Sequence, residues 1–300
     1  MKIAYIVSAY RLPGLLVRLV RRLQVPDASF LIHVDAKTPD RVYRALTEAL
    51  ADDANVMFLP RHACYWGDFG HVRATLVGLR TLIASGRPFD YVVLLTGQDY
   101  PIRTNAEIDE TFARAEGRVF MRGSALPTEH WGGGGLDRIE QWHFRLGRRR
   151  FSFPGTPFRH TALNAVWSAP ARAFRLRRRF PDGLRPYGGA SYWCMPAACA
   201  RYVDEFVRTS PRFVDFFRRV HVPDEIFFQT IVMNSPFRAR MAEGNLHYCD
   251  WTAGGDHPKV LTMEDVNVIM HSRKLFARKF DPDVDAVVLD RIDELLDGAA

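Results

Sequence analysis

The sequence predicts an α/β fold with a mainly parallel central sheet. Short apolar runs alternate with helical patterns through the first hundred residues, which is the order of elements that builds such a sheet. In addition, 47% of the 300 residues are hydrophobic, enough for a sizeable buried core. We therefore expect a folded, globular protein.

The apolar runs of the first half are short and end at polar residues, as buried strands do. They predict strands at residues 2–9, 30–34, 56–59 and 91–95. Amphipathic spacing predicts helices between them, at 15–23, 42–50 and 72–83. Ligands of parallel sheets bind at the carboxyl ends of the strands. The candidate ligand contacts are therefore the polar residues found there: Ser8, His33, Asp35 and Asp99.

The pattern loosens after about residue 104. The glycine run 132–135 lacks the strand and helix context of a phosphate-binding loop, so we expect a flexible loop. Helices are predicted at 197–207 and 224–233, the second with Asp224 as N-cap and Glu225 in its first turn. Acidic residues are common at helix starts for stability alone. A catalytic Glu225 is thus one of two interpretations at this stage.

Charge and cysteine content narrow the class of protein. The net charge is +7, and all but five of the 41 basic residues are arginine, with clusters at 148–150, 172–179 and 218–219. Such clusters could contact an acidic glycan, an anionic membrane or nucleic acid, but a solvated basic face is the simpler interpretation, and we expect no nucleic-acid role. Four cysteines without paired spacing predict no disulfide framework. With no signal-peptide pattern and no apolar run near the roughly 20 residues of a membrane span, we expect a cytoplasmic location.

Residues 275–280 hold Arg278 and Lys279 between bulky apolar side chains. A forked donor beside a point charge suits a diphosphate, although the charged end of a strand or helix is an equal alternative. The D-x-D sequences within 281–285 follow no apolar strand and precede the helical pattern 287–296, so they indicate a helix start. No His/Cys cluster has zinc spacing, and the sequence predicts no metal site.

Several segments, taken in order, resemble glycosyltransferase family 14, the core-2/I-branching and peptide O-xylosyltransferase family. They span about residues 2–285 and include Ile32-His33-Val34-Asp35, Tyr65-Trp66-Gly67, residues 94–104, 188–193, Pro223-Asp224-Glu225, residues 245–251 and 276–280. The resemblance implies a GT-A-like Rossmann-type fold, an inverting mechanism and a UDP-sugar donor, without the D-x-D metal site of most GT-A enzymes. It also implies one domain over 1–300, with a nucleotide-binding half at about 1–104 and an acceptor and catalytic half at about 105–285.

The resemblance assigns roles residue by residue. Glu225 falls on the general base, and Arg278 and Lys279 fall on the cations that hold the donor diphosphate. Asp35 and Trp66 fall on the donor site. No cofactor is expected. Contacts to the acceptor, whether a glycan, a lipid-linked sugar or a protein, are expected from Asp99, Glu140, Tyr192, Tyr248 and Trp251.

Alternatives remain open. Xylosyltransferases tend to have Asp at the position of Ser191, so Ser191-Tyr192 favours UDP-GlcNAc over UDP-xylose. Other classes are a noncatalytic binder of anionic polymers, built on the arginine clusters, and a glycoside hydrolase that uses Asp99 and Glu225 as a carboxylate pair. Eukaryotic family members carry a membrane anchor and many cysteines. Since this sequence shows neither, we expect a bacterial protein, cytoplasmic or peripheral to the inner membrane.

Overall fold

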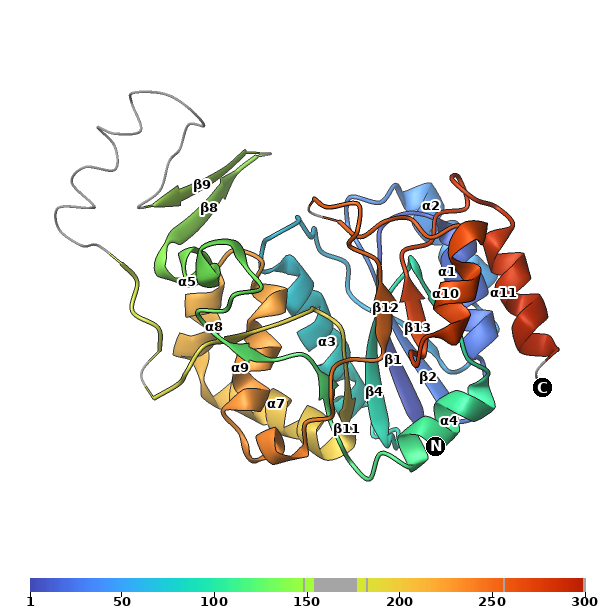
Figure 1. Cartoon of the computed structure of the whole chain (residues 1–300), viewed down its shortest axis with the longest axis horizontal. Helices are drawn as coiled ribbons and strands as arrows, with labels where there is room; N and C mark the ends of the chain where they lie inside the picture. Colours follow the sequence, from blue (N-terminus) through green and yellow to red (C-terminus); the bar gives the residue numbers. More distant parts are fainter. Residues whose placement is uncertain (148, 154–176, 182, 256, 299–300) are drawn as a thin grey trace.

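A six-stranded sheet forms the centre of the computed structural model (Figure 1). The structure describes residues 1–147, 149–153, 177–181, 183–255 and 257–298, so Arg148 and, of the predicted 172–179 cluster, Arg172 and Arg175 lie outside the described residues. The strand order is β3-β2-β1-β4-β11-β6, with bounds Val56–Phe58, Ala28–Val34, Ile3–Ala9, Tyr91–Thr96, Trp193–Pro196 and Phe120–Met121. The first four strands are parallel, and β11 runs antiparallel to both β4 and β6. The predicted α/β class with a mainly parallel sheet is confirmed.

Both faces of this sheet are buried. Successive side chains of a strand point to opposite sides, so a single strand contributes to both cores. On β1, Ile3, Tyr5 and Val7 belong to one core, whereas Ala4 and Ile6 belong to the other. The first core also holds side chains of α1 (Pro13–Leu23), α2 (Asp40–Ala49), α4 (Asn105–Ala113), α10 (Val266–His271) and α11 (Val288–Asp297). The second holds side chains of α3 (Gly70–Ala84), α7 (Ala197–Thr209), α8 (Pro211–Phe217) and α9 (Phe227–Met233).

A second sheet brings residues far apart in the sequence together. It contains β12 (His247–Cys249), β13 (Phe276–Arg278) and β5 (Asp99–Pro101) in that order. The pair β12–β13 is parallel and β13–β5 is antiparallel, with Arg278 in register with Asp99. The two charged candidates therefore become direct neighbours.

The region after residue 124 differs from the sequence-based expectation in two places. The glycine run makes a short 3₁₀ turn, η1 (Gly132–Gly135), in which Gly133 and Gly134 have left-handed φ angles of 63° and 73°. It leads into α5 (Asp137–Glu140) and the hairpin β8 (Trp142–Leu146) and β9 (Arg149–Phe153). The helix predicted from Asp224 begins later, at Phe227, and is preceded by a separate 3₁₀ helix, η2 (Pro223–Glu225). Asp224 is not an N-cap, because its Oδ2 accepts a hydrogen bond from Ser191 Oγ at 2.8 Å.

The remaining elements are short, apart from the C-terminal helix. They are the β7–β10 pair (Ser124–Ala125 with Tyr187–Gly188) and the 3₁₀ helices η3 (Pro236–Arg240) and η4 (Met263–Asp265). Asp285 Oδ1 accepts from the backbone N of Val287 and Val288, so this acidic segment starts a helix as predicted. No helix in the described part of the chain is long and apolar enough to cross a membrane.

Candidate active site

A cavity of about 710 Å³ lies at the carboxyl ends of β1, β2 and β4. We call it the central cavity. Its lining contains the predicted base Glu225 together with six other residues predicted for donor or acceptor contacts: Asp35, Trp66, Arg278, Lys279, Tyr192 and Trp251. Ser8 and His33, two of the strand-end candidates, line it as well. Candidates from both halves of the chain thus surround one space.

Glu225 reaches this cavity from η2, directly after a strained residue. Val222 has φ 49°, in the left-handed region that β-branched residues rarely enter, and its N–H donates to Gly67 O at 3.0 Å. Arg138 Nη1 of α5 contacts Glu225 Oε2 at 2.6 Å. The pKa of Glu225 is raised, first by burial and then by the charge of Asp224, while Arg138 opposes the rise. A carboxylate with a raised pKa is suited to accept a proton.

Two glycines allow the chain to pack closely here. Gly67 has φ 76°, and a Cβ at this position would lie 2.8 Å from the imidazole of His221. A Cβ on Gly189 would lie 2.0 Å from the carbonyl oxygen of Arg122, and Gly189 N–H donates to the carbonyl of Glu225 at 2.9 Å. Both positions therefore require glycine if the wall around Glu225 is to keep this shape.

The cations of β13 form another wall of the cavity. Arg278 Nε lies 3.5 Å from Asp99 Oδ1, and the guanidinium lies 4.5 Å from the centroid of the Tyr192 ring. Lys279 makes no ion pair with any side chain that the structure describes. The pKa of each group is lowered, mainly by burial and, for Lys279, also by the neighbouring positive charges. Both cations line the cavity and can bind an anion there.

Asp35 lies at the end of β2, where protein groups already pair with its negative charge. Its carboxylate accepts from Lys37 Nζ at 2.6 Å, from Lys37 N at 2.8 Å and from Cys64 N at 3.3 Å. Although burial raises its pKa, the bonds to Lys37 outweigh burial and lower it. Lys37 also donates to the carbonyl of Cys64. Both Asp35 and Lys37 line the cavity as an ion pair.

The structure does not place three predicted acceptor contacts in the cavity lining. Asp99 is fully buried and accepts from Thr96 N and Oγ1 at 2.8 and 2.7 Å, so it lies beside Arg278 and has no surface for an acceptor. Glu140 pairs with Arg177 Nη1 at 2.9 Å. Tyr248 packs against the first core. These three side chains contact other protein groups and do not line the cavity.

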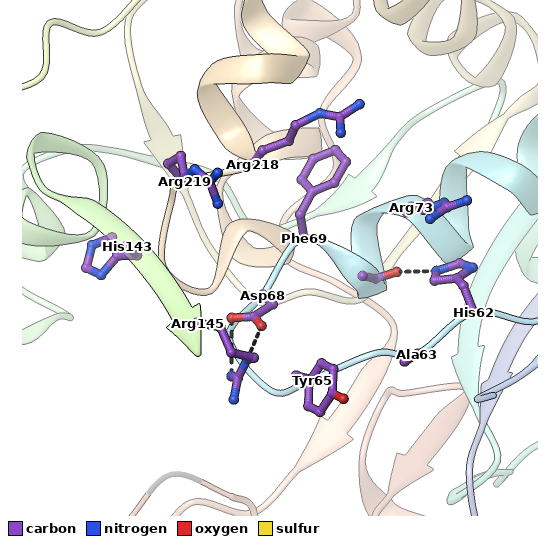
Figure 2. A pocket seen from close by; sticks show the side chains of 11 residues that line it. His62, Ala63, Tyr65, Asp68, Phe69, Arg73, His143, Arg145, Arg218 and Arg219 are labelled. Carbon is purple, nitrogen blue, oxygen red and sulfur yellow. Dashed lines mark hydrogen bonds and ion pairs between the residues drawn. The ribbon is translucent and has the colours of Figure 1, made fainter. Parts of the chain in front are cut away.

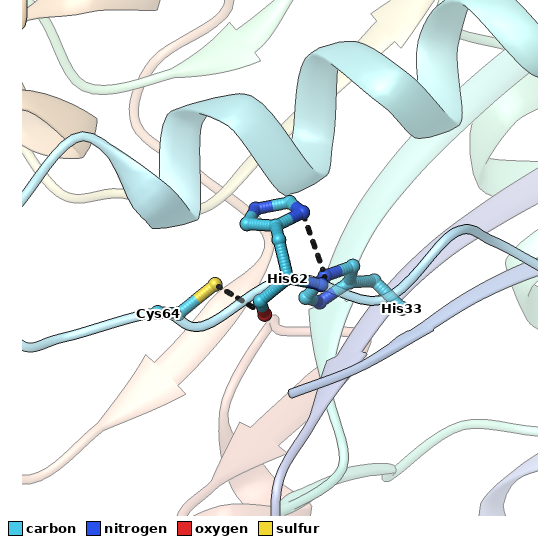
Figure 3. A group of neighbouring side chains, drawn as sticks. All are labelled: His33, His62 and Cys64. Carbon is cyan, nitrogen blue, oxygen red and sulfur yellow. Dashed lines mark hydrogen bonds between the residues drawn. The ribbon is translucent and has the colours of Figure 1, made fainter. Parts of the chain in front are cut away.

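One group of side chains could hold a metal ion, although the sequence spacing predicted none. His33, His62 and Cys64 place their ligand atoms within 4.8 Å of one another (Figure 3). His33 Nε2 lies 3.1 Å from His62 Nδ1, and His62 Nε2 lies 2.9 Å from Gly70 O, so the imidazole nitrogens already have protein partners. Burial lowers the pKa of His33 to about 4, which keeps it neutral at pH 7. Sequence spacing could not show this group, because His33 lies on a different element from the other two.

Several residues in or beside the cavity lining were not singled out in the sequence. Lys37 carried a signal, since it lies two residues after Asp35 and is one of only five lysines. Arg138 carried none, because its contact to Glu225 joins residues 87 positions apart. His247 stacks on Tyr192 with ring centroids 4.7 Å apart, and burial lowers its pKa to about 3. Only the fold brings such groups together.

Comparison with known proteins decides the family. The family model "Core-2/I-Branching enzyme" matches residues 3–271. The chain belongs to the core-2/I-branching enzyme family. A relative from sheep, a beta-1,3-galactosyl-O-glycosyl-glycoprotein beta-1,6-N-acetylglucosaminyltransferase 3, is 23% identical over 93% of this chain. The fruit-fly xylosyltransferase oxt is 23% identical over 94%, and human xylosyltransferase 1 is 24% identical over 99%.

The family members are longer than the part of them that this chain matches. The chain spans 64% of the sheep enzyme, 32% of the fly enzyme and 30% of the human enzyme. Among solved structures, a mannose-1-phosphate geranyltransferase from Thermus thermophilus matches 81% of this chain and 69% of its own, at 16% identity and a TM-score of 0.32. A score this low indicates no more than a remote likeness of fold.

Proposed function

We propose that this protein is a glycosyltransferase that moves a sugar from a UDP-sugar to an acceptor hydroxyl with inversion. The observation that carries the proposal is the convergence of Glu225, Arg278 and Lys279 on one cavity of about 710 Å³. Family membership supports it, since the sheep, fly and human relatives are named as sugar transferases.

In the proposed reaction Glu225 removes the acceptor proton while the acceptor oxygen attacks the anomeric carbon. The bond to UDP breaks on the opposite face, and Arg278 and Lys279 stabilise the diphosphate as its charge grows. Arg138 holds Glu225 in place through the 2.6 Å contact. Glu225 must be ionised to act, and its raised pKa makes the ionised carboxylate a stronger base.

We further propose that transfer needs no divalent metal. Two fixed cations supply the positive charge that a metal ion would supply at the leaving group. The acidic segment 281–285 is unsuited to a metal, because Asp285 accepts from the backbone N–H groups of Val287 and Val288 and Asp281 pairs with Arg11 at 2.8 Å. The His33, His62 and Cys64 group is the one alternative among the described residues.

UDP-GlcNAc is the proposed donor, with UDP-xylose as the alternative. The small Ser191 lines the cavity and is held by Asp224. A side chain of this size leaves room for a substituent that xylose lacks. The acceptor is proposed to be a glycan hydroxyl, and the relatives' names do not choose between glycan and protein.

Two other functions fit the structure less well. A glycoside hydrolase needs two carboxyl groups flanking the bond, but Asp99 has no exposed surface. A noncatalytic binder of anionic polymers gives no role to a half-buried Glu225 with a raised pKa. The decisive experiment is UDP release from a panel of UDP-sugars, with thermal shift by UDP and by a DNA oligonucleotide. Stabilisation by UDP and release from UDP-GlcNAc are expected, whereas stabilisation by DNA alone would reject the enzyme.

A further inference from the structure

A second, smaller cavity shares a wall with the central cavity. It encloses about 350 Å³, at the lower end of the roughly 300–1,000 Å³ of ligand pockets. Four arginines line it, Arg73, Arg145, Arg218 and Arg219, against a single carboxylate, Asp68 (Figure 2). We call it the arginine cavity.

The positive charge of the arginine cavity is only partly neutralised. Arg145 forms an ion pair with Asp68, and Arg218 Nε lies 3.2 Å from Asp215. Within the described ranges, Arg73 and Arg219 have no ion-pair partner, and Arg219 lies over the ring of Phe144 at 5.1 Å. At least two guanidinium groups are therefore available to an anion.

The segments that line the arginine cavity continue to the catalytic side. Residues 62–70 alternate between the two cavities, with Tyr65 in one and Trp66 in the other. Arg219 lies six residues before Glu225, in the turn that follows α8. Arg145 lies on β8, directly after α5, whose Arg138 contacts Glu225. A molecule held at Glu225 would thus have the arginine cavity beside it.

We propose that the arginine cavity binds an oxyanion group, a phosphate, sulfate or carboxylate, carried by the acceptor glycan. The inference rests on the proposed function and specifies its acceptor as anionic. Guanidinium groups suit such oxyanions because their planar fork donates two parallel hydrogen bonds. The position near Glu225 favours the acceptor over the donor, whose diphosphate is expected at Arg278 and Lys279.

The test measures binding of small probes by titration calorimetry with UDP in excess, so that the diphosphate site of the central cavity is filled. The probes are glucose 6-phosphate, glucuronic acid and uncharged glucose. The variant Arg73→Gln/Arg219→Gln removes the two cations without ion-pair partners. Its matched control, Arg41→Gln/Arg44→Gln, removes the same charge from exposed positions of α2 that line neither cavity.

Wild type and control are expected to bind glucose 6-phosphate at least about tenfold more tightly than glucose, and the Arg73/Arg219 variant is expected to lose that difference. Equal binding of the charged and neutral sugars by wild type overturns the proposal, as does equal behaviour of the two double variants. Sedimentation with phosphatidylglycerol vesicles is measured in parallel. Loss of vesicle binding alone in the Arg73/Arg219 variant overturns the acceptor role in favour of a membrane contact.

Failure of the proposed function is separable from failure of this inference. UDP binding and UDP-sugar hydrolysis use the central cavity, and both should be unchanged in the Arg73/Arg219 variant. If no variant, and not even the wild type, binds UDP, the proposed transferase is wrong. Selective binding of glucose 6-phosphate through Arg73 and Arg219 can still be measured in that case.

Discussion

The charged groups that line the central cavity differ in how far they are already paired with protein groups. At the end of β2, Asp35 is already neutralised by Lys37, and its pKa is lowered. Elsewhere in the cavity lining, Arg278 and Lys279 have lowered pKa values and Glu225 has a raised one, each mainly because of burial. The Asp35–Lys37 pair is neutral without a ligand, whereas Lys279 has no ion-pair partner among the described side chains.

This difference distinguishes a wall that shapes the site from a wall that reacts. An ion pair such as that of buried Asp35 with exposed Lys37 holds its own geometry. Arg278 has Asp99 as its partner at 3.5 Å, whereas Lys279 is half-buried without an ion-pair partner among the described side chains, so an incoming diphosphate adds negative charge where it is missing. The reacting wall should therefore dominate transfer, and the paired wall should affect it less.

The largest expected effect follows from removing the base. Glu225→Gln keeps the shape of the side chain but cannot take a proton, so transfer should fall by roughly a hundredfold or more while UDP binding persists. The measurement is initial transfer rate with a thermal shift by UDP as the folding control. Glu140→Gln is the matched variant, because Glu140 pairs with Arg177 and does not line the cavity. Similar losses in both variants would show that Glu225 has no special role.

Removing both cations should have the next largest effect. Arg278→Ala/Lys279→Ala should weaken UDP binding by about tenfold or more and slow transfer as well, since the diphosphate gains charge as the glycosidic bond breaks. Of the single variants, Lys279→Ala should be the more sensitive. The measurements are the Kd for UDP and kcat for transfer. Lys259→Ala is the control, because Lys259 pairs with Asp265 outside the cavity lining. Unchanged UDP affinity in the double variant would place the diphosphate elsewhere.

A smaller effect is expected from replacing Arg138, the ion-pair partner of Glu225, and it should appear in the pH profile of kcat/KM. Glu225 acts when deprotonated, so transfer should rise with pH through its raised pKa. Arg138 lowers that pKa, and Arg138→Gln should therefore move the acidic limb of kcat/KM to higher pH. Arg80→Gln, whose partner Asp204 lies outside both cavities, should leave the limb in place. A limb that does not move would mean that Glu225 does not control the rate.

The smallest expected effect is that of metal removal. Transfer should be unchanged by excess EDTA and by added Mn²⁺, because fixed cations face the leaving group. Cys64→Ser, which removes one of the three clustered ligands, should behave like wild type in both conditions, and Cys249→Ser is its control in the same cavity lining. If EDTA abolishes transfer and Mn²⁺ restores it, the cation mechanism is wrong. Loss that zinc restores in wild type but not in Cys64→Ser would instead identify the His33, His62 and Cys64 group as a required metal site.

The sequence by itself determined the local elements and the β/α order. The strands and helices of the first half follow from periodicity, because a strand buried on both faces is a short apolar run and an amphipathic helix repeats every three to four residues. Strand ends then pointed to Ser8, His33 and Asp35, which line the central cavity. The family resemblance pointed to Glu225, Arg278 and Lys279, which line the same cavity.

Only the tertiary structure decided which charged groups became partners. Arg138 and Glu225, or Asp99 and Arg278, are far apart in the chain and meet because strand pairing and loop packing bring them together. Sequence pattern could not show that Asp99 is buried while Trp66 is exposed, or that Asp224 holds Ser191 instead of capping a helix. Burial and pairing set the pKa of each group, and both are properties of three-dimensional packing.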